Sequence, residues 1–223
     1  MKATKIFAII PAHNEFKNIG KVIRGAKKHV KNVVVVDDGS KDETPRIAKE
    51  NGAILLRHII NLGKGAALKT GCDFAIKQRA DDIIVLDADG QHDPAEIPNF
   101  INRLKDADIV FGCRKKRKDM PFIFKFGNWF ITQATKFVCG IDLKDTQCGY
   151  RAFSSAAYKK IRWNASDYSM ESEMIARAGK HKLKYKEVPI ATIYSDKYKG
   201  TTVLDGIKIV VNMLWWKVLN NRG

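Results

Sequence analysis

Residues 83–94 read IIVLDADGQHDP, and this stretch indicates the fold class of the chain. Its first part, Ile83–Leu86, is continuously apolar, as expected for a strand that is buried on both faces. The acidic segment Asp87–Gln91 follows directly, and Pro94 marks the approach of a helix. A buried strand that ends in carboxylates and leads into a helix is typical of one unit of an α/β sheet.

The same alternation of short apolar runs and helical segments is found on both sides of this stretch. The predicted strands are Ile6–Ile10, Val33–Val36, Ile54–Leu56, Ile83–Leu86 and Ile109–Phe111. The predicted helices are Ile19–Val30, Asp42–Asn51, Gly65–Lys77 and Ala95–Lys105. We therefore expect an α/β fold with a Rossmann-like, mostly parallel sheet that is covered by helices.

Two of these helices have recognisable starts. Ser40 and Glu43 have the spacing of a capping box, in which each side chain accepts a main-chain N–H from the other residue. Asp93 precedes a proline and stands three residues before Glu96, so Asp93 is the expected N-cap of its helix.

Composition limits the class of protein. With 223 residues, of which 45% are hydrophobic and 29% charged, the chain is expected to form one domain over residues 1–223. Lys and Arg number 40 against 24 Asp and Glu, which gives a formal net charge of +16. Such a charge predicts an anionic partner: nucleic acid, an acidic membrane surface or phosphorylated substrates.

The cysteines and the apolar runs indicate the cellular setting. Four cysteines without a CxxC pair disfavour a zinc ribbon or a disulfide framework. No apolar run reaches the ~18 residues that a spanning helix needs, and the N-terminal run is too short for a signal peptide. We expect a protein on the cytoplasmic side that is able to contact a membrane.

The second half of the chain contains two amphipathic segments. Pro121–Cys139 is expected to be a helix with five aromatic residues on one face, and a packed core helix explains it as well as a membrane contact does. Val203–Leu219 is strongly apolar but has a polar stripe, which argues against spanning. Trp215 and Trp216 near Lys217 suit a bilayer interface.

Polar residues follow each predicted strand, at the edge where open parallel sheets bind ligands. Asp87 and Asp89 are the sharpest signal, because two carboxylates that leave one strand can reach the same hard cation. Mg²⁺ favours one or two carboxylates together with substrate phosphates. A lone pair of this kind more often caps a helix, so the interpretation depends on the neighbouring motifs. Lys64, in a Gly-rich turn, is suited to phosphate.

Several motifs together resemble a known family. In chain order they are IIPAHNE, VVVVDDGSKDET, NLGKGAAL, IIVLDADGQHDP, FGCRKKR and DTQCGYRAF, over residues 9–153. They are similar to family-2 glycosyltransferases of the GT-A fold, of the type that makes dolichyl-phosphate mannose or glucose. Those enzymes move a sugar from a nucleotide-sugar to a polyprenyl phosphate. The resemblance implies a nucleotide-sugar-binding half over residues 1–113 and an acceptor-facing and membrane-facing half over residues 114–223.

The resemblance also implies roles for individual residues. The implied substrate-binding residues are Pro11, Ala12, Glu15, Asp38, Lys64, Asp87, Ala88, Asp89, Gln91, Arg114, Asp145, Gln147 and Arg151. The implied ligands of a Mg²⁺ or Mn²⁺ ion are Asp87, Asp89 and Gln91. The implied catalytic residues are Asp89, Arg114, Arg151 and Glu173, the last before an apolar helix. The chain departs from many relatives after Val188-Pro189, where Lys197 or Lys199 would have to replace a family arginine.

The chemistry that the resemblance implies needs no general base, because a polyprenyl phosphate is already an anion near neutral pH. Two alternatives stay open. A related transferase that acts on a saccharide needs a base, for which Glu171, Glu173 or Asp145 is available. A basic module that binds nucleic acid or membrane without catalysis would use the cations of residues 114–118, although no nucleic-acid-binding motif accompanies them. The sequence does not choose among GDP-mannose, UDP-glucose and UDP-N-acetylglucosamine as donors.

Overall fold

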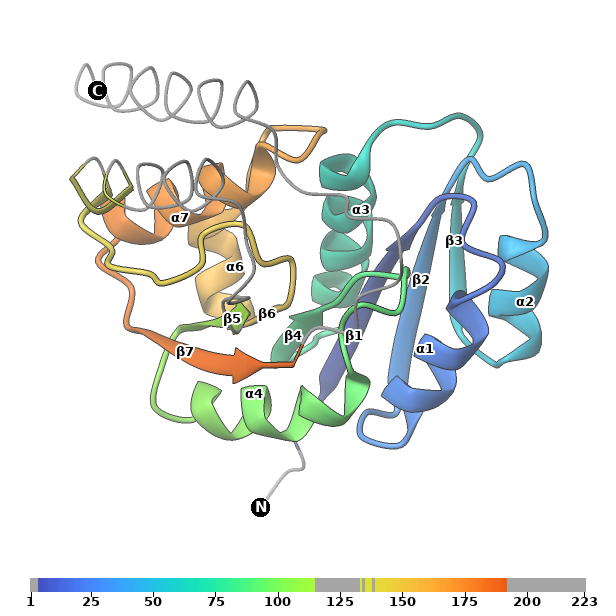
Figure 1. The fold of residues 1–223 in the computed structure, drawn as a ribbon, viewed down its shortest axis with the longest axis horizontal. Helices are drawn as coiled ribbons and strands as arrows, with labels where there is room; N and C mark the ends of the chain where they lie inside the picture. The colour runs from blue at the N-terminus through green and yellow to red at the C-terminus, as the bar shows by residue number, and fades with distance from the viewer. Residues whose placement is uncertain (1–3, 115–132, 134, 138, 192–223) are drawn as a thin grey trace, which may run out of the picture.

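The computed structural model describes residues 4–114, 133, 135–137 and 139–191. Within them the chain forms an α/β fold with one seven-stranded sheet, in the order β3-β2-β1-β4-β6-β5-β7 (Figure 1). The strands are β1 (Ile6–Ala12), β2 (Asn32–Asp38), β3 (Ile54–His58), β4 (Asp82–Val85), β5 (Ile109–Arg114), β6 (Arg151–Ser154) and β7 (Tyr185–Ile190). The helices are α1 (Ile19–Lys27), α2 (Thr44–Glu50), α3 (Lys64–Lys77), the 3₁₀ turn η1 (Pro94–Glu96), α4 (Ile97–Leu104), α6 (Ser155–Ile161) and α7 (Met170–Lys180).

The sheet is mostly parallel, as the sequence predicts. β1 pairs in parallel with β2 and with β4, β2 with β3, and β5 with β7. The exception is β6, which runs antiparallel between β4 and β5. All five predicted strands are present. Four of them agree with the prediction within two residues at each end, and β5 extends three residues further, to Arg114. β6 is not among the predicted strands.

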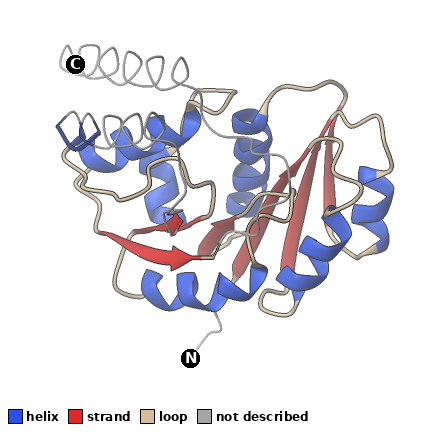
Figure 2. Cartoon of the chain, viewed as in Figure 1, coloured by secondary structure: helices blue, strands red, loops and turns tan. Residues whose placement is uncertain are grey.

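Alternate residues of the buried strands pack against different helical layers. Ile9 of β1 belongs to a hydrophobic cluster with α3, α6 and α7. Ile10 belongs to a second cluster with α1, α2 and α4 on the opposite face. The two layers of helices enclose the sheet in Figure 2. Burial on both faces explains why the strands read as continuous apolar runs rather than as alternating ones.

The two predicted helix starts have different outcomes. Asp93 is the N-cap of η1 and its carboxylate accepts the N–H of Ala95, as predicted. The capping box at Ser40 is wrong, because α2 begins at Thr44 and the Ser40 hydroxyl instead accepts the N–H of Asn14. Ser40 therefore connects the loops that follow β1 and β2.

The predicted amphipathic segments cannot be compared with this fold. Most of Pro121–Cys139 and all of Val203–Leu219 lie outside the described residues, as do Lys197 and Lys199. In the part of the chain that is described, no helix is long and apolar enough to cross a membrane. None of the four cysteines is in a disulfide.

Candidate active site

The loops after β1, β2 and β3 lie together at the top of the view in Figure 1, where the carboxyl ends of these strands meet. Asp38 joins two of them. Its carboxylate accepts the N–H groups of Leu62 and Gly63 at 2.9 and 2.8 Å, which fixes the turn before α3. It also accepts a hydrogen bond from Nδ1 of His58 at 2.7 Å.

His58 is a residue that the sequence does not single out. An ionised carboxylate only accepts hydrogen bonds, so the contact with Asp38 places the proton of His58 on Nδ1. Nε2 of the same ring lies 3.0 Å from the hydroxyl of Thr70. The ring is thus held between β2 and α3 and orients the Asp38 carboxylate. Only an apolar strand ending in a histidine marks it in the sequence, and this pattern carries little information.

Lys64, the first residue of α3, lies between two carboxylates. Its Nζ is 2.8 Å from Oδ1 of Asp87 at the end of β4 and 3.0 Å from Oε1 of Glu171 on α7. Burial alone would lower the pKa of Lys64, but the two carboxylates outweigh it and raise the pKa above its usual value. Burial alone would raise the pKa of Asp87, but Lys64 and other nearby cations lower it to about 2. Lys64 and Asp87 are therefore both charged at neutral pH.

Gly149, in the segment before β6, lies against Asp87 and Lys64. A Cβ atom at this position would lie 2.7 Å from Oδ2 of Asp87 and 3.0 Å from Nζ of Lys64. A side chain at this position would therefore push the Asp87 carboxylate and the Lys64 ammonium out of their present positions. The glycine of the DTQCGYRAF motif has a steric role at the site.

Asp89 shapes the turn that follows β4. Its Oδ1 accepts the N–H of Gln91 at 2.9 Å, and Gly90 between them has a φ of 77°. No group of three or more His, Cys, Asp or Glu side chains that could hold a metal ion occurs among the described residues. Asp87 and Asp89 provide two hard oxygen donors, a set that fits Mg²⁺ or Mn²⁺ when substrate phosphates complete the coordination.

The ring of His92 is hydrogen-bonded to the same turn. The N–H of Asp87 donates to Nδ1 of His92 at 3.3 Å, and the ring stacks on Tyr150 with a centroid distance of 5.1 Å. Burial lowers the pKa of His92, against the opposing effect of the Asp87 carboxylate. The ring is a neutral hydrogen-bond partner of the loop, as the sequence suggests.

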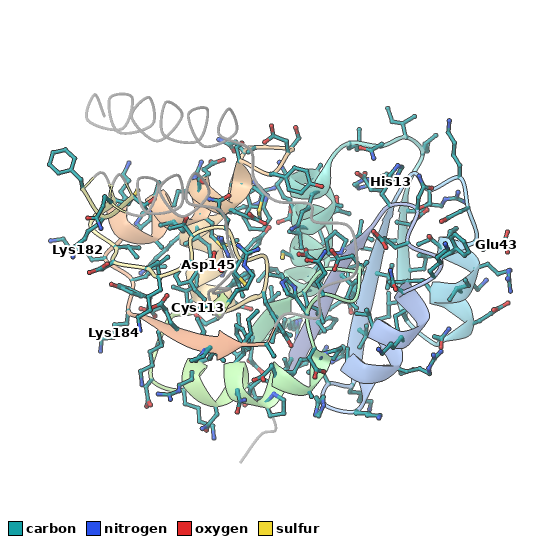
Figure 3. The ribbon with its side chains drawn as sticks, viewed as in Figure 1. His13, Glu43, Cys113, Asp145, Lys182 and Lys184 are labelled. Carbon is teal, nitrogen blue, oxygen red and sulfur yellow. The ribbon has the colours of Figure 1, made fainter. Side chains whose placement is uncertain are left out.

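Arg114 and Asp145 form a two-point ion pair at the end of β5. Nε and Nη2 of Arg114 donate to the two oxygens of Asp145 at 2.6 and 3.0 Å. The Arg114 side chain remains 38% exposed. Asp145 also accepts the N–H of Gln147, whose amide contacts Ser172 at 3.5 Å. In Figure 3, Asp145 is labelled left of centre and His13 in the upper right part of the molecule.

Arg151 lies in a different environment from the one that the resemblance implies. Its side chain is 1% exposed, and its guanidinium donates to the carbonyl oxygens of Cys148, Thr146 and Glu171. These bonds use the donors that a phosphate would need, and burial lowers its pKa. In this geometry Arg151 holds the loop before β6 against α7, and the phosphate contact that the resemblance implies stays a prediction.

Glu173 is also a structural group in this geometry. Its carboxylate accepts the N–H groups of Asn164 and Ala165 at 3.0 Å and pairs with Arg177 one helical turn later. It lies within α7 rather than before a helix.

The other predicted residues lie near the strand ends. Pro11, Ala12 and Ala88 are buried there, and Glu15 lies in the loop that leads to α1.

Comparison with known proteins agrees with this geometry. The model of the family described as glycosyl transferase family 2 matches residues 7–162. The UDP-N-acetylglucosamine–dolichyl-phosphate N-acetylglucosaminyltransferase of Methanococcus voltae is 36% identical, over 96% of this chain and 96% of that protein. The polyprenol monophosphomannose synthase of Mycolicibacterium smegmatis is 26% identical, over 92% of this chain and 83% of its own length.

Solved structures share the fold. Glucosyl-3-phosphoglycerate synthase of Mycobacterium tuberculosis, in complex with Mg²⁺ and UDP, has a TM-score of 0.75 and 18% identity, covering 95% of this chain and 79% of that one. The same enzyme with Mn²⁺, UDP and its product has a TM-score of 0.70, also at 18% identity, with 96% and 80% covered. These neighbours are GT-A glycosyltransferases that bind a divalent cation together with a nucleotide. The predictions of a GT-A fold and of a glycosyltransferase are confirmed, and the chain belongs to glycosyl transferase family 2.

Proposed function

We propose that this glycosyltransferase moves a sugar from a nucleotide-sugar to a polyprenyl phosphate, with inversion at the sugar carbon. The donor would be GDP-mannose, UDP-glucose or UDP-N-acetylglucosamine, and the product a lipid-phosphate sugar that serves later glycosylation. The names of two relatives support the acceptor class, because one acts on dolichyl phosphate and the other is a polyprenol monophosphomannose synthase.

The observation that carries this proposal is that each of the three carboxylates that could serve as a general base forms an ion pair. Asp145 is bonded to Arg114, Glu171 to Lys64 and Glu173 to Arg177. Burial alone would raise the pKa of Asp145, but its hydrogen bonds to Arg114 outweigh this and lower the pKa below its usual value. A carboxylate held in this way accepts a proton poorly. The arrangement suits an acceptor that is already an anion and disfavours a saccharide hydroxyl.

The donor would lie along the ends of β1, β2 and β4. In this proposal Asp38, Pro11, Ala12 and Glu15 surround the nucleoside. Asp87, Asp89 and Gln91 would hold a divalent cation, which neutralises charge on the leaving diphosphate when it is bound. Nζ of Lys64 lies 2.8 Å from Asp87, so its ammonium group would add a second positive charge beside the proposed cation site.

The acceptor phosphate would bind at the exposed part of Arg114. A guanidinium offers bidentate contact to phosphate, and Asp145 fixes its plane. Gln147 and Arg151 would keep the loop before β6 in place, Arg151 through its three carbonyl contacts rather than through the phosphate. The main work of the enzyme is to position two anions that repel each other.

The acceptor lipid implies work at a bilayer, and we propose peripheral attachment to the cytoplasmic face of a membrane. The segments 122–137 and 203–219, which lie largely outside the described residues, are the sequence-based candidates for this contact. Several cations near an anionic surface contribute about 1 kcal/mol each, so a protein with a net charge of +16 suits such a surface.

The proposal is tested by a screen of nucleotide-sugars with a short polyprenyl phosphate and Mg²⁺ or Mn²⁺. We expect one donor to give a lipid-linked product, and a chelator to stop the reaction. Turnover that persists with the chelator would remove the metal from the proposal. Transfer to a saccharide in place of the lipid phosphate would favour the related soluble-acceptor enzyme.

A further inference from the structure

Exposed apolar side chains gather at the edge of the sheet that carries the candidate site. In the described part of the chain, seven large hydrophobic side chains are exposed, and five of them lie on loops at this edge. The five, which we call the apolar rim, are Phe16, Ile59, Ile60, Leu62 and Tyr168. They come from the loop after β1, the loop after β3 and the loop between α6 and α7. The latter two loops are at the top of the view in Figure 1.

The loop after β3 is fixed by its main chain while its side chains point outward. Asp38 accepts the N–H groups of Leu62 and Gly63, and a Cβ atom on Gly39 would lie 2.6 Å from the carbonyl carbon of Ile60. Ile59 is nevertheless 99% exposed and Ile60 65% exposed. The protein therefore holds two neighbouring isoleucines in water on a well-bonded loop.

The loop between α6 and α7 is part of the same surface. The carbonyl oxygen of Ser166 accepts the N–H of Ala66 at 3.1 Å, and the two glycines beside Lys64 have no room for a Cβ atom against residues 165–167. Tyr168 at the end of this loop is 70% exposed, and its ring lies 5.5 Å from Nζ of Lys64. The apolar rim thus adjoins the lysine of the candidate site.

Cations flank the apolar rim. Lys17 lies over the ring of Phe16 at 5.7 Å, and Lys41 is exposed on the loop after β2. Acidic side chains are present in the same loops: Glu43 pairs with Arg46, and Asp42 accepts the N–H groups of Thr44 and Phe16. Arg57 pairs with the buried Asp37, and Asp167 binds Ser169. Protruding apolar side chains with lysines beside them match the interface of an acidic bilayer.

We propose that the apolar rim inserts into the surface of an acidic lipid bilayer, with Ile59 and Ile60 as its tip. The inference rests on the proposed function, since a lipid-borne phosphate reaches the site only from the bilayer side. It adds a contact made by four residues of the nucleotide-binding half and by Tyr168, separate from the two amphipathic segments. With the rim in the headgroup layer, the carboxyl edge of the sheet faces the lipid phosphates.

The test compares vesicle binding of the full chain with that of charged variants. Vesicles of neutral and acidic phospholipid are sedimented with wild type, with Ile59→Glu/Ile60→Glu and with Ile54→Glu as the matched control. Ile54 is also exposed, at 39%, but it pairs with Val34 at the opposite end of β3. Each rim isoleucine that leaves the bilayer should weaken binding about tenfold or more, and the control should bind like wild type.

Two further measurements separate the inference from the proposed function. Transfer to a short, water-dispersed polyprenyl phosphate should be unchanged in the rim variant, because the site itself is intact. Wild-type vesicle binding by the rim variant, or equal loss in the Ile54→Glu control, would overturn the inference. Loss of transfer to the short acceptor would also overturn it, because the rim would then belong to the substrate pocket.

A change of oligomeric state in size-exclusion chromatography would assign the rim to self-association instead. Absence of any transfer by wild type, with rim-dependent vesicle binding intact, would count against the proposed function alone.

Discussion

At the scale of single residues, Lys64 connects three parts of the fold. It starts α3, pairs with Asp87 at the end of β4 and pairs with Glu171 on α7. Its ammonium compensates two carboxylates that would otherwise repel each other. Buried ion pairs of this kind are costly to break from one side, because the remaining charge is left without a partner.

Asp89 is predicted to be needed for catalysis but little for stability. Asp89→Ala removes a carboxylate that we propose as a ligand of the divalent cation, so transfer should fall about 100-fold or more while the Tm stays close to that of wild type. Asp93→Ala is the control, because it removes a helix cap worth about 1 kcal/mol and leaves the metal site intact. Normal metal-dependent turnover by Asp89→Ala would show that the cation binds elsewhere.

Gly149 is predicted to tolerate no side chain. The methyl group of Gly149→Ala would press on Asp87 and Lys64, at a cost of about 1–3 kcal/mol in unfolding free energy. Gly140→Ala is the control, since its φ of 70° is strained but no atom lies within 4 Å of the new Cβ. Urea denaturation measures the change in unfolding free energy. Transfer assays should show lost activity for Gly149→Ala only. Equal activity in both variants would contradict the steric role.

His92 is predicted to make the stability of the fold fall in mild acid. Burial lowers its pKa in the folded protein below the usual value of 6.5. The unfolded chain then binds the proton first, so stability is fully present above pH 6.5 and decreases as the pH falls below it. The Tm of wild type should drop more between pH 7 and pH 5 than that of His92→Gln. Parallel curves for the two proteins would count against a buried neutral ring.

At the scale of elements, the turn from β3 to α3 depends on His58. His58→Ala removes one hydrogen bond to Asp38 and leaves Thr70 without its ring partner. We expect the KM for the nucleotide-sugar to rise about tenfold with a smaller change in kcat, because the nucleoside pocket loosens while the diphosphate site is kept. The exposed His29 provides the control substitution. A loss in kcat alone would place His58 in the chemical step.

The same element shows why some features can be predicted from sequence and others cannot. Buried parallel strands such as β2 read as apolar runs because both of their faces are covered, and carboxylates after them identify the site edge. β6 is short and antiparallel, and only its partners β4 and β5 define it. Arg151 has the charge of a phosphate ligand, but three carbonyl oxygens far apart in sequence surround it. Ser40 has the spacing of a cap, but a tertiary contact with Asn14 uses its hydroxyl.

At the scale of the whole molecule, the two helical layers leave one edge of the sheet for function. The candidate nucleoside, metal and acceptor residues all lie on loops or strand ends at that edge, and the apolar rim borders it. A single edge that combines a diphosphate site with exposed apolar side chains suits an enzyme whose donor comes from water and whose acceptor comes from a bilayer.

The most direct test of this account is the choice between a lipid phosphate and a lipid alcohol. The donor identified by the screen is incubated with a short polyprenyl phosphate or with the matching polyprenol, and the lipid products are separated and identified by mass. Since the candidate base carboxylates are held in ion pairs, we predict sugar transfer to the phosphate and none to the alcohol. Transfer to the alcohol at a comparable rate would require a general base at this site and would contradict the account.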